Sequence, residues 1–132
     1  MEQPRKERVL VVDDNQDILF STRLILEKYG YSVQTAENGP QALERLKEGI
    51  PSVVLLDWMM PKMSGIEVLK QIRANPATAS VPVILVTAKT QDEDMLLGYQ
   101  HNADYYLVKP ASAKQLLYAI NLVLGKADLI TG

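Results

Sequence analysis

Five short runs rich in valine, isoleucine and leucine alternate with longer amphipathic stretches along most of the chain. This alternation is typical of repeated strand–helix units that build one parallel sheet. The pattern predicts strands at residues 8–13, 32–36, 53–56, 83–86 and 105–108. It predicts helices at residues 16–29, 40–48, 65–74, 92–101 and 112–124. We therefore expect an α/β fold made of five such units.

Local signals support these limits. Gly30 follows the first predicted helix and can adopt the left-handed conformation that ends a helix. Ser112 and Gln115 have the spacing of a capping box at the start of the last helix. The strand at 32–36 alternates apolar and polar residues, which indicates an edge position, whereas the continuously apolar run at 53–56 indicates a central one.

The size and composition indicate a single soluble domain. The chain has 132 residues, of which 47% are hydrophobic and 23% charged, so it can bury one core and disorder is not expected. Its net charge of −2 argues against direct nucleic-acid binding, which needs a basic face. Cysteine is absent, which excludes disulfides and thiolate metal sites. No segment predicts a signal peptide or a membrane span, and we expect a cytoplasmic protein.

Polar residues stand at the ends of four of the apolar runs. The first run is followed by Asp13 and Asp14, the third by Asp57, the fourth by Thr87 and the fifth by Lys109. Parallel strands place their carboxyl ends on one edge of the sheet, and ligands bind there at a topological switch point. We therefore expect these residues to converge on one site.

Three carboxylates at one site point to a bound cation. Asp13, Asp14 and Asp57 would repel one another and resist ionisation unless a hard cation lay among them. An oxygen-only set of ligands favours Mg2+ over zinc, and Mn2+ is also compatible with it. The alternative is that Asp13, Asp14 and Asn15 form a helix-capping turn, for which aspartate and asparagine are preferred residues. The pairing with Asp57 favours the metal site.

No neighbouring base follows the strand that ends before Asp57, so this carboxylate is not set up as one half of an acid–base pair. Asp57 is instead a candidate nucleophile. A carboxylate can attack phosphorus to give an aspartyl phosphate. In that chemistry magnesium and a lysine such as Lys109 neutralise the phosphoryl oxygens, and the Thr87 hydroxyl is able to donate a hydrogen bond to one of them. Taken alone, Lys109 also suits the start of a loop, and Thr87 an ordinary strand position.

These residues carry a resemblance to a known family. The sequence resembles the receiver domain of two-component response regulators (CheY-like) in the pair Asp13-Asp14 and in segments 55–65, 86–88 and 103–110. The similarity covers residues 8–124 and leaves a polar N-terminal segment at 1–7 and a C-terminal tail or linker stub at 125–132. It implies a flavodoxin-like, doubly wound (βα)5 sandwich with strand order 2-1-3-4-5 and five flanking helices.

The resemblance also implies roles for single residues. Asp57 would accept a phosphoryl group from the phosphohistidine of a sensor histidine kinase or of a phosphotransfer protein. The expected magnesium ligands are Asp13, Asp14, Asp57 and the main-chain carbonyl of Met59, with Asp13 acting largely through water. Lys109 would pair with the phosphoryl oxygens.

Thr87 and Tyr106 are similar to the switch pair of this family. The threonine would move toward the phosphoryl group, and the aromatic ring would turn into the space it leaves. The peptide bond between Lys109 and Pro110 is expected to be cis, as in relatives. Such a switch is a shift of population between two packings, biased by a new dianion.

The expected output surface consists of the fourth helix, the fifth strand and the fifth helix. It would contact a downstream effector protein or domain, or a second copy of the chain in a homodimer. Its candidate contact residues are Met95, Leu96, Tyr99, Tyr106, Tyr118 and Leu122. At helical spacing several of these residues are expected to lie in the core instead.

Met59 lies two residues beyond the expected acceptor, and Lys89 lies two residues beyond the switch threonine. In the family that this chain resembles, the residues at these two positions flank the path of the hydrolytic water. A thioether and a long cation orient water poorly. We therefore hypothesise that the phosphorylated state is not short-lived. Ser64 and Asn102 stand where relatives often have aspartate and glycine, and both still suit a helix cap and a left-handed turn.

Three other functions compete with this one. A phosphatase or mutase with an aspartyl nucleophile would place a second aspartate at position 59, which is Met59 here. A nucleotide-binding module would have a glycine-rich first loop in place of the acidic turn. An interaction module that is never phosphorylated would be expected to have lost one of the site residues. We expect a switch that reacts with itself rather than an enzyme with an external substrate.

Overall fold

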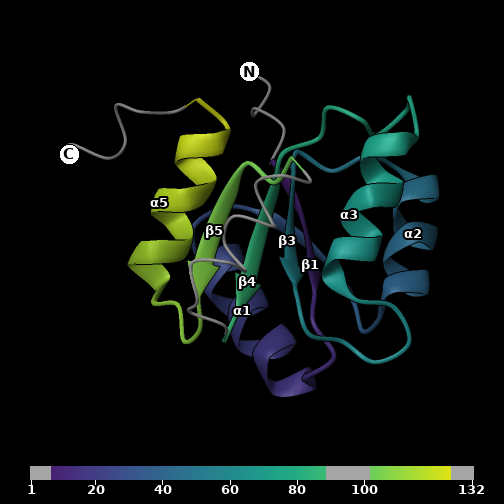
Figure 1. Ribbon diagram of the computed structural model, residues 1–132. Helices are drawn as coiled ribbons and strands as arrows, with labels where there is room; N and C mark the ends of the chain where they lie inside the picture. Colours follow the sequence, from purple (N-terminus) through teal and green to yellow (C-terminus); the bar gives the residue numbers. More distant parts are fainter. Residues whose placement is uncertain (1–6, 89–101, 126–132) are drawn as a thin grey trace.

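The computed structural model describes residues 7–88 and 102–125 of the chain (Figure 1). Its strands are β1 (Arg8–Val12), β2 (Ser32–Ala36), β3 (Val53–Asp57), β4 (Val83–Thr87) and β5 (Tyr105–Val108). Its helices are α1 (Gln16–Lys28), α2 (Gly39–Glu48), α3 (Gly65–Ala74) and α5 (Ala113–Val123). The helix predicted at 92–101 lies outside the described residues, and so do Lys89, Met95, Leu96 and Tyr99.

The five strands form one parallel sheet in the order β2-β1-β3-β4-β5. This order confirms the predicted doubly wound topology, with β3 in the centre and β2 at an edge. Between β1 and β3 the direction of winding reverses, because β2 lies on one side of β1 and β3 on the other. The carboxyl ends of these two strands therefore border the switch point at which ligands bind in such sheets.

Helices cover both faces of the sheet (Figure 1). Alternate strand residues point to opposite faces, so that Leu10 and Leu56 pack with α2 and α3, whereas Val9 and Leu55 pack with α1 and α5. Each such side chain, fully buried, contributes about 1.5–3 kcal/mol to folding. None of the helices in the described ranges is long and apolar enough to cross a membrane.

Side-chain caps set where the helices begin. Asn15 and Asn38 cap α1 and α2 by accepting hydrogen bonds from backbone N–H groups of the first turn. The capping alternative for the acidic turn is thus correct for Asn15, whereas Asp13 and Asp14 precede the cap. Ser112 forms the predicted capping box, so that α5 begins one residue later than predicted. Because Asn38 is the cap, α2 begins one residue earlier than predicted.

The strands next to the switch point end slightly differently from the prediction. β1 ends one residue earlier, at Val12, while β3 and β4 continue through Asp57 and Thr87. Both extensions occur because ladder pairing persists there, Asp57 with Val86 and Thr87 with Val108. These residues are therefore held by the rigid sheet and not by a loop.

Two predicted left-handed positions are present. Gly30 has φ 94° after α1, and Asn102 has φ 70° in the turn before β5. Asparagine tolerates this conformation better than most residues with a side chain. Ser64 also caps α3 as expected, with its side chain accepting a hydrogen bond from the backbone of Glu67.

Candidate functional site at the carboxyl edge of the sheet

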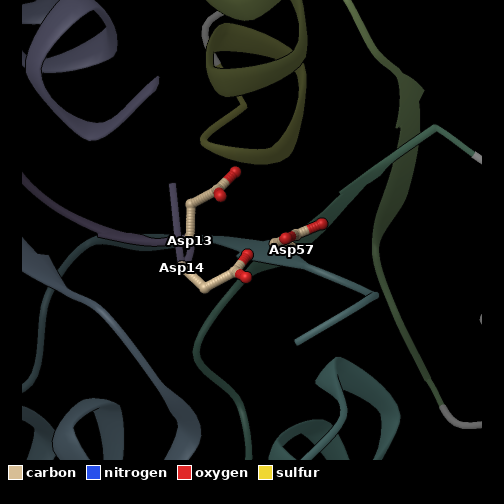
Figure 2. A group of neighbouring side chains, drawn as sticks. All are labelled: Asp13, Asp14 and Asp57. Carbon is tan, nitrogen blue, oxygen red and sulfur yellow. The ribbon is translucent and has the colours of Figure 1, made fainter. Parts of the chain in front are cut away.

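Three carboxylates meet at the carboxyl ends of β1 and β3 (Figure 2). Asp13 and Asp14 directly follow β1, and Asp57 is the last residue of β3. One oxygen atom from each lies within 4.8 Å of the others. Asp13 and Asp57 are buried, whereas Asp14 is exposed, so the cluster opens to solvent on one side. Their oxygen-only chemistry fits the expected magnesium ion.

Lys109 enters the same cluster from the end of β5. Its Nζ atom lies 2.6 Å from Oδ2 of Asp13 and 3.3 Å from Oδ1 of Asp57. The backbone N–H of Lys109 donates to the carbonyl of Thr87 at 2.7 Å, which ties the start of this loop to β4. The peptide bond between Lys109 and Pro110 is cis. One ammonium group thus faces two buried carboxylates.

The cluster changes the proton affinity of its members. Burial and, next, the negative charge of Asp13 raise the pKa of Asp57 to about 6, although Lys109 and the backbone N–H of Met59 oppose this change. Burial disfavours the charge on Lys109, but its hydrogen bond to Asp13 and the charge of Asp57 outweigh burial and raise its pKa. Asp57 is therefore mostly ionised at pH 7.5 but close to its titration range.

A close backbone approach holds the loop that follows Asp57. The N–H of Gly65, the first residue of α3, donates to the carbonyl of Trp58 at 2.8 Å. A Cβ atom at position 65 would lie 2.3 Å from the carbonyl oxygen of Asp57, so only glycine fits there. Sequence reasoning missed this role, although a glycine opening a predicted helix just after the acceptor was a usable signal.

Aromatic packing connects the site with β5. Tyr106 is buried and contacts Trp58 edge-on, with ring centroids 6.1 Å apart and planes at 74°. Trp58 follows Asp57 directly, so this contact runs from the cluster to the expected switch residue. Sequence reasoning did not single out Trp58, because a lone tryptophan after a strand has no local signature of its partner.

The predicted site residues are thus partly brought together. Asp13, Asp14, Asp57 and Lys109 meet in one cluster. Thr87 is fully buried at the end of the adjacent strand β4, joined to Lys109 through the backbone. The two remaining predicted positions are Met59 and Lys89. Met59 is 57% exposed, and Lys89 lies beyond the part of the chain that the structure describes.

Comparison with known proteins identifies the family. Residues 9–121 match the family described as "Response regulator receiver domain". The chain belongs to this family. Receiver domains are signalling switches of two-component systems, so the resemblance inferred from the sequence is confirmed.

Individual relatives show how far the likeness extends. The protein PilH of Pseudomonas aeruginosa is 38% identical over 117 residues, which are 89% of this chain and 97% of PilH. The phosphate regulon transcriptional regulatory protein PhoB of Rhizobium meliloti is 35% identical over 91% of this chain. That match spans 53% of PhoB, so this chain corresponds to about half of the longer relative.

Solved structures give the same result for the fold. The chemotaxis protein CheY4 of Vibrio cholerae aligns with a TM-score of 0.87 at 32% identity, covering 91% of this chain and 100% of CheY4. A CheY-like receiver domain protein from Methanospirillum hungatei aligns with a TM-score of 0.86 at 30% identity, over 95% and 98% of the two chains. The receiver-domain fold therefore extends over nearly the whole chain.

Proposed function

We propose that this receiver domain accepts a phosphoryl group on Asp57 in a magnesium-dependent reaction. The donor would be the phosphohistidine of a sensor histidine kinase or of a phosphotransfer protein. The observation that carries the proposal is the position of Asp57, a buried carboxylate that faces the Lys109 ammonium within a three-carboxylate cluster. Such a group is poised to react with a phosphorus atom whose oxygens need positive charge around them.

The residues of the site have separate tasks in this reaction. An oxygen of Asp57 attacks phosphorus, and the histidine nitrogen of the donor leaves. Lys109 moves from its carboxylate partners to the phosphoryl oxygens, and the Thr87 hydroxyl donates to one of them. Asp13, Asp14, Asp57 and the main-chain carbonyl of Met59 would hold a magnesium ion, which neutralises charge on the phosphoryl group.

The phosphoryl group would then act as a ligand that favours a second packing of the domain. Thr87 is buried one strand away from Asp57, and its shift toward the phosphoryl oxygens would free space for the ring of Tyr106. Tyr106 also contacts Trp58, which directly follows Asp57, so the ring is connected to the acceptor through this contact as well as through Thr87. These residues form the proposed switch.

The proposed output surface includes β5 and α5. Val108 is 37% exposed, Tyr118 41% and Leu122 40%, so each offers apolar surface to a partner. They would contact a downstream effector protein or domain, or a second copy of the chain. The domain would act in the cytoplasm as a switch without turnover of an external substrate and without direct nucleic-acid contact.

Acetyl phosphate with Mg2+ tests the proposal directly. We expect one acid-stable, base-labile acyl phosphate per chain on the wild type and none on Asp57→Asn. Trp58 is the single tryptophan of the chain and adjoins Asp57, so its fluorescence should change in the same reaction. Label retained by Asp57→Asn would contradict the proposal, and steady release of phosphate from an external phosphoester would favour the phosphatase. Absence of label on the folded wild type would favour an interaction module.

A further inference from the structure

Three methionines follow β3, and they differ in exposure. Met59 is 57% exposed, whereas Met60 and Met63 are partly buried and pack against the apolar cluster beneath α2 and α3. The sulfur of Met63 also lies 4.0 Å from the side-chain amide nitrogen of Gln71. A small oxidant in solution therefore reaches the thioether of Met59 more easily than either neighbour.

The backbone of Met59 is held against the acceptor. Its N–H donates a hydrogen bond to the carboxylate of Asp57. The same loop is closed by the bond from Gly65 to Trp58. A chemical change at Met59 therefore occurs two residues from the acceptor, on a backbone that is hydrogen-bonded to the acceptor carboxylate.

We propose that Met59 is a peroxide-sensitive modification site that controls the lifetime of phosphorylated Asp57. The inference rests on the proposed function. A peroxide transfers one oxygen atom to the sulfur, its O–O bond breaks, and water (from hydrogen peroxide) leaves. The thioether is oxidised to a sulfoxide and the peroxide is reduced. A dithiol reductant restores the thioether, as its two thiols are oxidised to a disulfide and the sulfoxide oxygen leaves as water, so the modification is reversible.

The sulfoxide changes how water meets the acyl phosphate. Hydrolysis adds water to phosphorus, breaks the bond between phosphorus and the Asp57 oxygen, and releases inorganic phosphate. A thioether is a weak hydrogen-bond acceptor, whereas a sulfoxide oxygen is a strong one and can orient the attacking water. One such added hydrogen bond corresponds to hydrolysis that is about three- to tenfold faster.

To test this, the full chain is treated with limiting hydrogen peroxide. Peptide mass spectrometry then measures the sulfoxide at every methionine. The treated and untreated proteins are then phosphorylated with acetyl phosphate and Mg2+, and decay of the acyl phosphate is followed. We expect Met59 to be oxidised before Met60 and Met63, and the decay to become about three- to tenfold faster.

Matched variants assign the effect to one sulfur atom. For each variant the measured quantity is the ratio of decay rates with and without peroxide. Met59→Leu should give a ratio near one, and Met63→Leu should keep the wild-type ratio. Met59→Gln, which carries a permanent neutral acceptor, should decay faster than Met59→Leu without peroxide.

Several outcomes would overturn the inference. These are preferential oxidation at another methionine of this loop, an unchanged or slower decay after Met59 is oxidised, or a peroxide effect that persists in Met59→Leu. Failure of the proposed function looks different, because the untreated wild type would then form no acyl phosphate at all.

Discussion

Asp57 illustrates how tertiary contacts change a single residue. The side chain is buried beside Asp13, and its pKa rises to about 6 even though Lys109 lies 3.3 Å away. In the unfolded chain the same carboxyl would have its ordinary pKa of 3.8. The folded protein therefore binds a proton at Asp57 more tightly than the unfolded chain does. Folding therefore destabilises the ionised form of Asp57, which is the form that reacts with phosphorus.

This shift predicts a pH-dependent gain in stability for Asp57→Asn. A raised folded-state pKa gives stability that is present below about pH 4 and is lost as pH rises through about 6. Without divalent cations, the variant should be more stable than wild type at pH 7.5 by on the order of 1–3 kcal/mol and nearly equal near pH 4. Urea unfolding at both pH values measures this difference.

Asp17→Asn is the matched control for that measurement. Asp17 is an exposed carboxylate in the first turn of α1, where a negative charge is favourable. This substitution should not stabilise the protein at either pH. If Asp57→Asn were no more stable than wild type at pH 7.5, burial and the charge of Asp13 would not destabilise ionised Asp57 as argued above.

At the scale of elements, Arg73 joins the end of α3 to the segments that precede β4 and β5. It lies in the last turn of α3, and its guanidinium donates to the carbonyls of Ala79, Val81 and Asn102. It also bonds Oδ2 of Asp104 at 2.8 Å, an atom that accepts from the backbone of β4 as well. One side chain thus positions the beginnings of both β4 and β5.

Arg73→Met should therefore be strongly destabilising. The substitution retains apolar bulk but removes the donor to three carbonyls and one of the donors to the half-exposed carboxylate of Asp104, and we expect a loss of about 1–3 kcal/mol. Arg23→Met is the control, because the Arg23–Glu27 pair on α1 is about half exposed and worth under ~1 kcal/mol. Chemical unfolding compares the two variants. Equal, small losses of unfolding free energy in the two variants would mean that Arg73 does not hold the beginnings of β4 and β5 in place.

At the scale of the whole molecule, the carboxylate cluster bridges β1 and β3 across the switch point of the sheet. A cation bound there would stabilise the folded chain, since the three residues are brought together only by folding. At a magnesium concentration about tenfold above Kd, the gain in unfolding free energy is ~1.4 kcal/mol.

Asp14→Asn should remove most of this gain. Asp14 is exposed, so the substitution should cost little in the absence of metal. Asp17→Asn, three residues further along, should keep the full magnesium effect. Thermal unfolding with and without Mg2+ provides the comparison. An equal magnesium response in both variants would place the cation elsewhere.

The fold followed from local signals to within one or two residues at most ends. Apolar runs, the capping box at Ser112 and the left-handed residues Gly30 and Asn102 each depend on a few neighbouring residues, so they are visible in the sequence. The convergence of Asp13, Asp14, Asp57 and Lys109 was also predictable, because parallel strands must end at one edge.

The sequence by itself determined the order of elements, the edge at which the polar residues gather and the set of ligand atoms available there. Only the tertiary structure decided the raised pKa of Asp57, the contact of Tyr106 with Trp58 and the space limit at Gly65. Periodicity and caps are encoded over a few residues. Proton affinity, ring contacts and backbone clearance depend on how segments far apart in the chain approach one another, which local patterns do not specify.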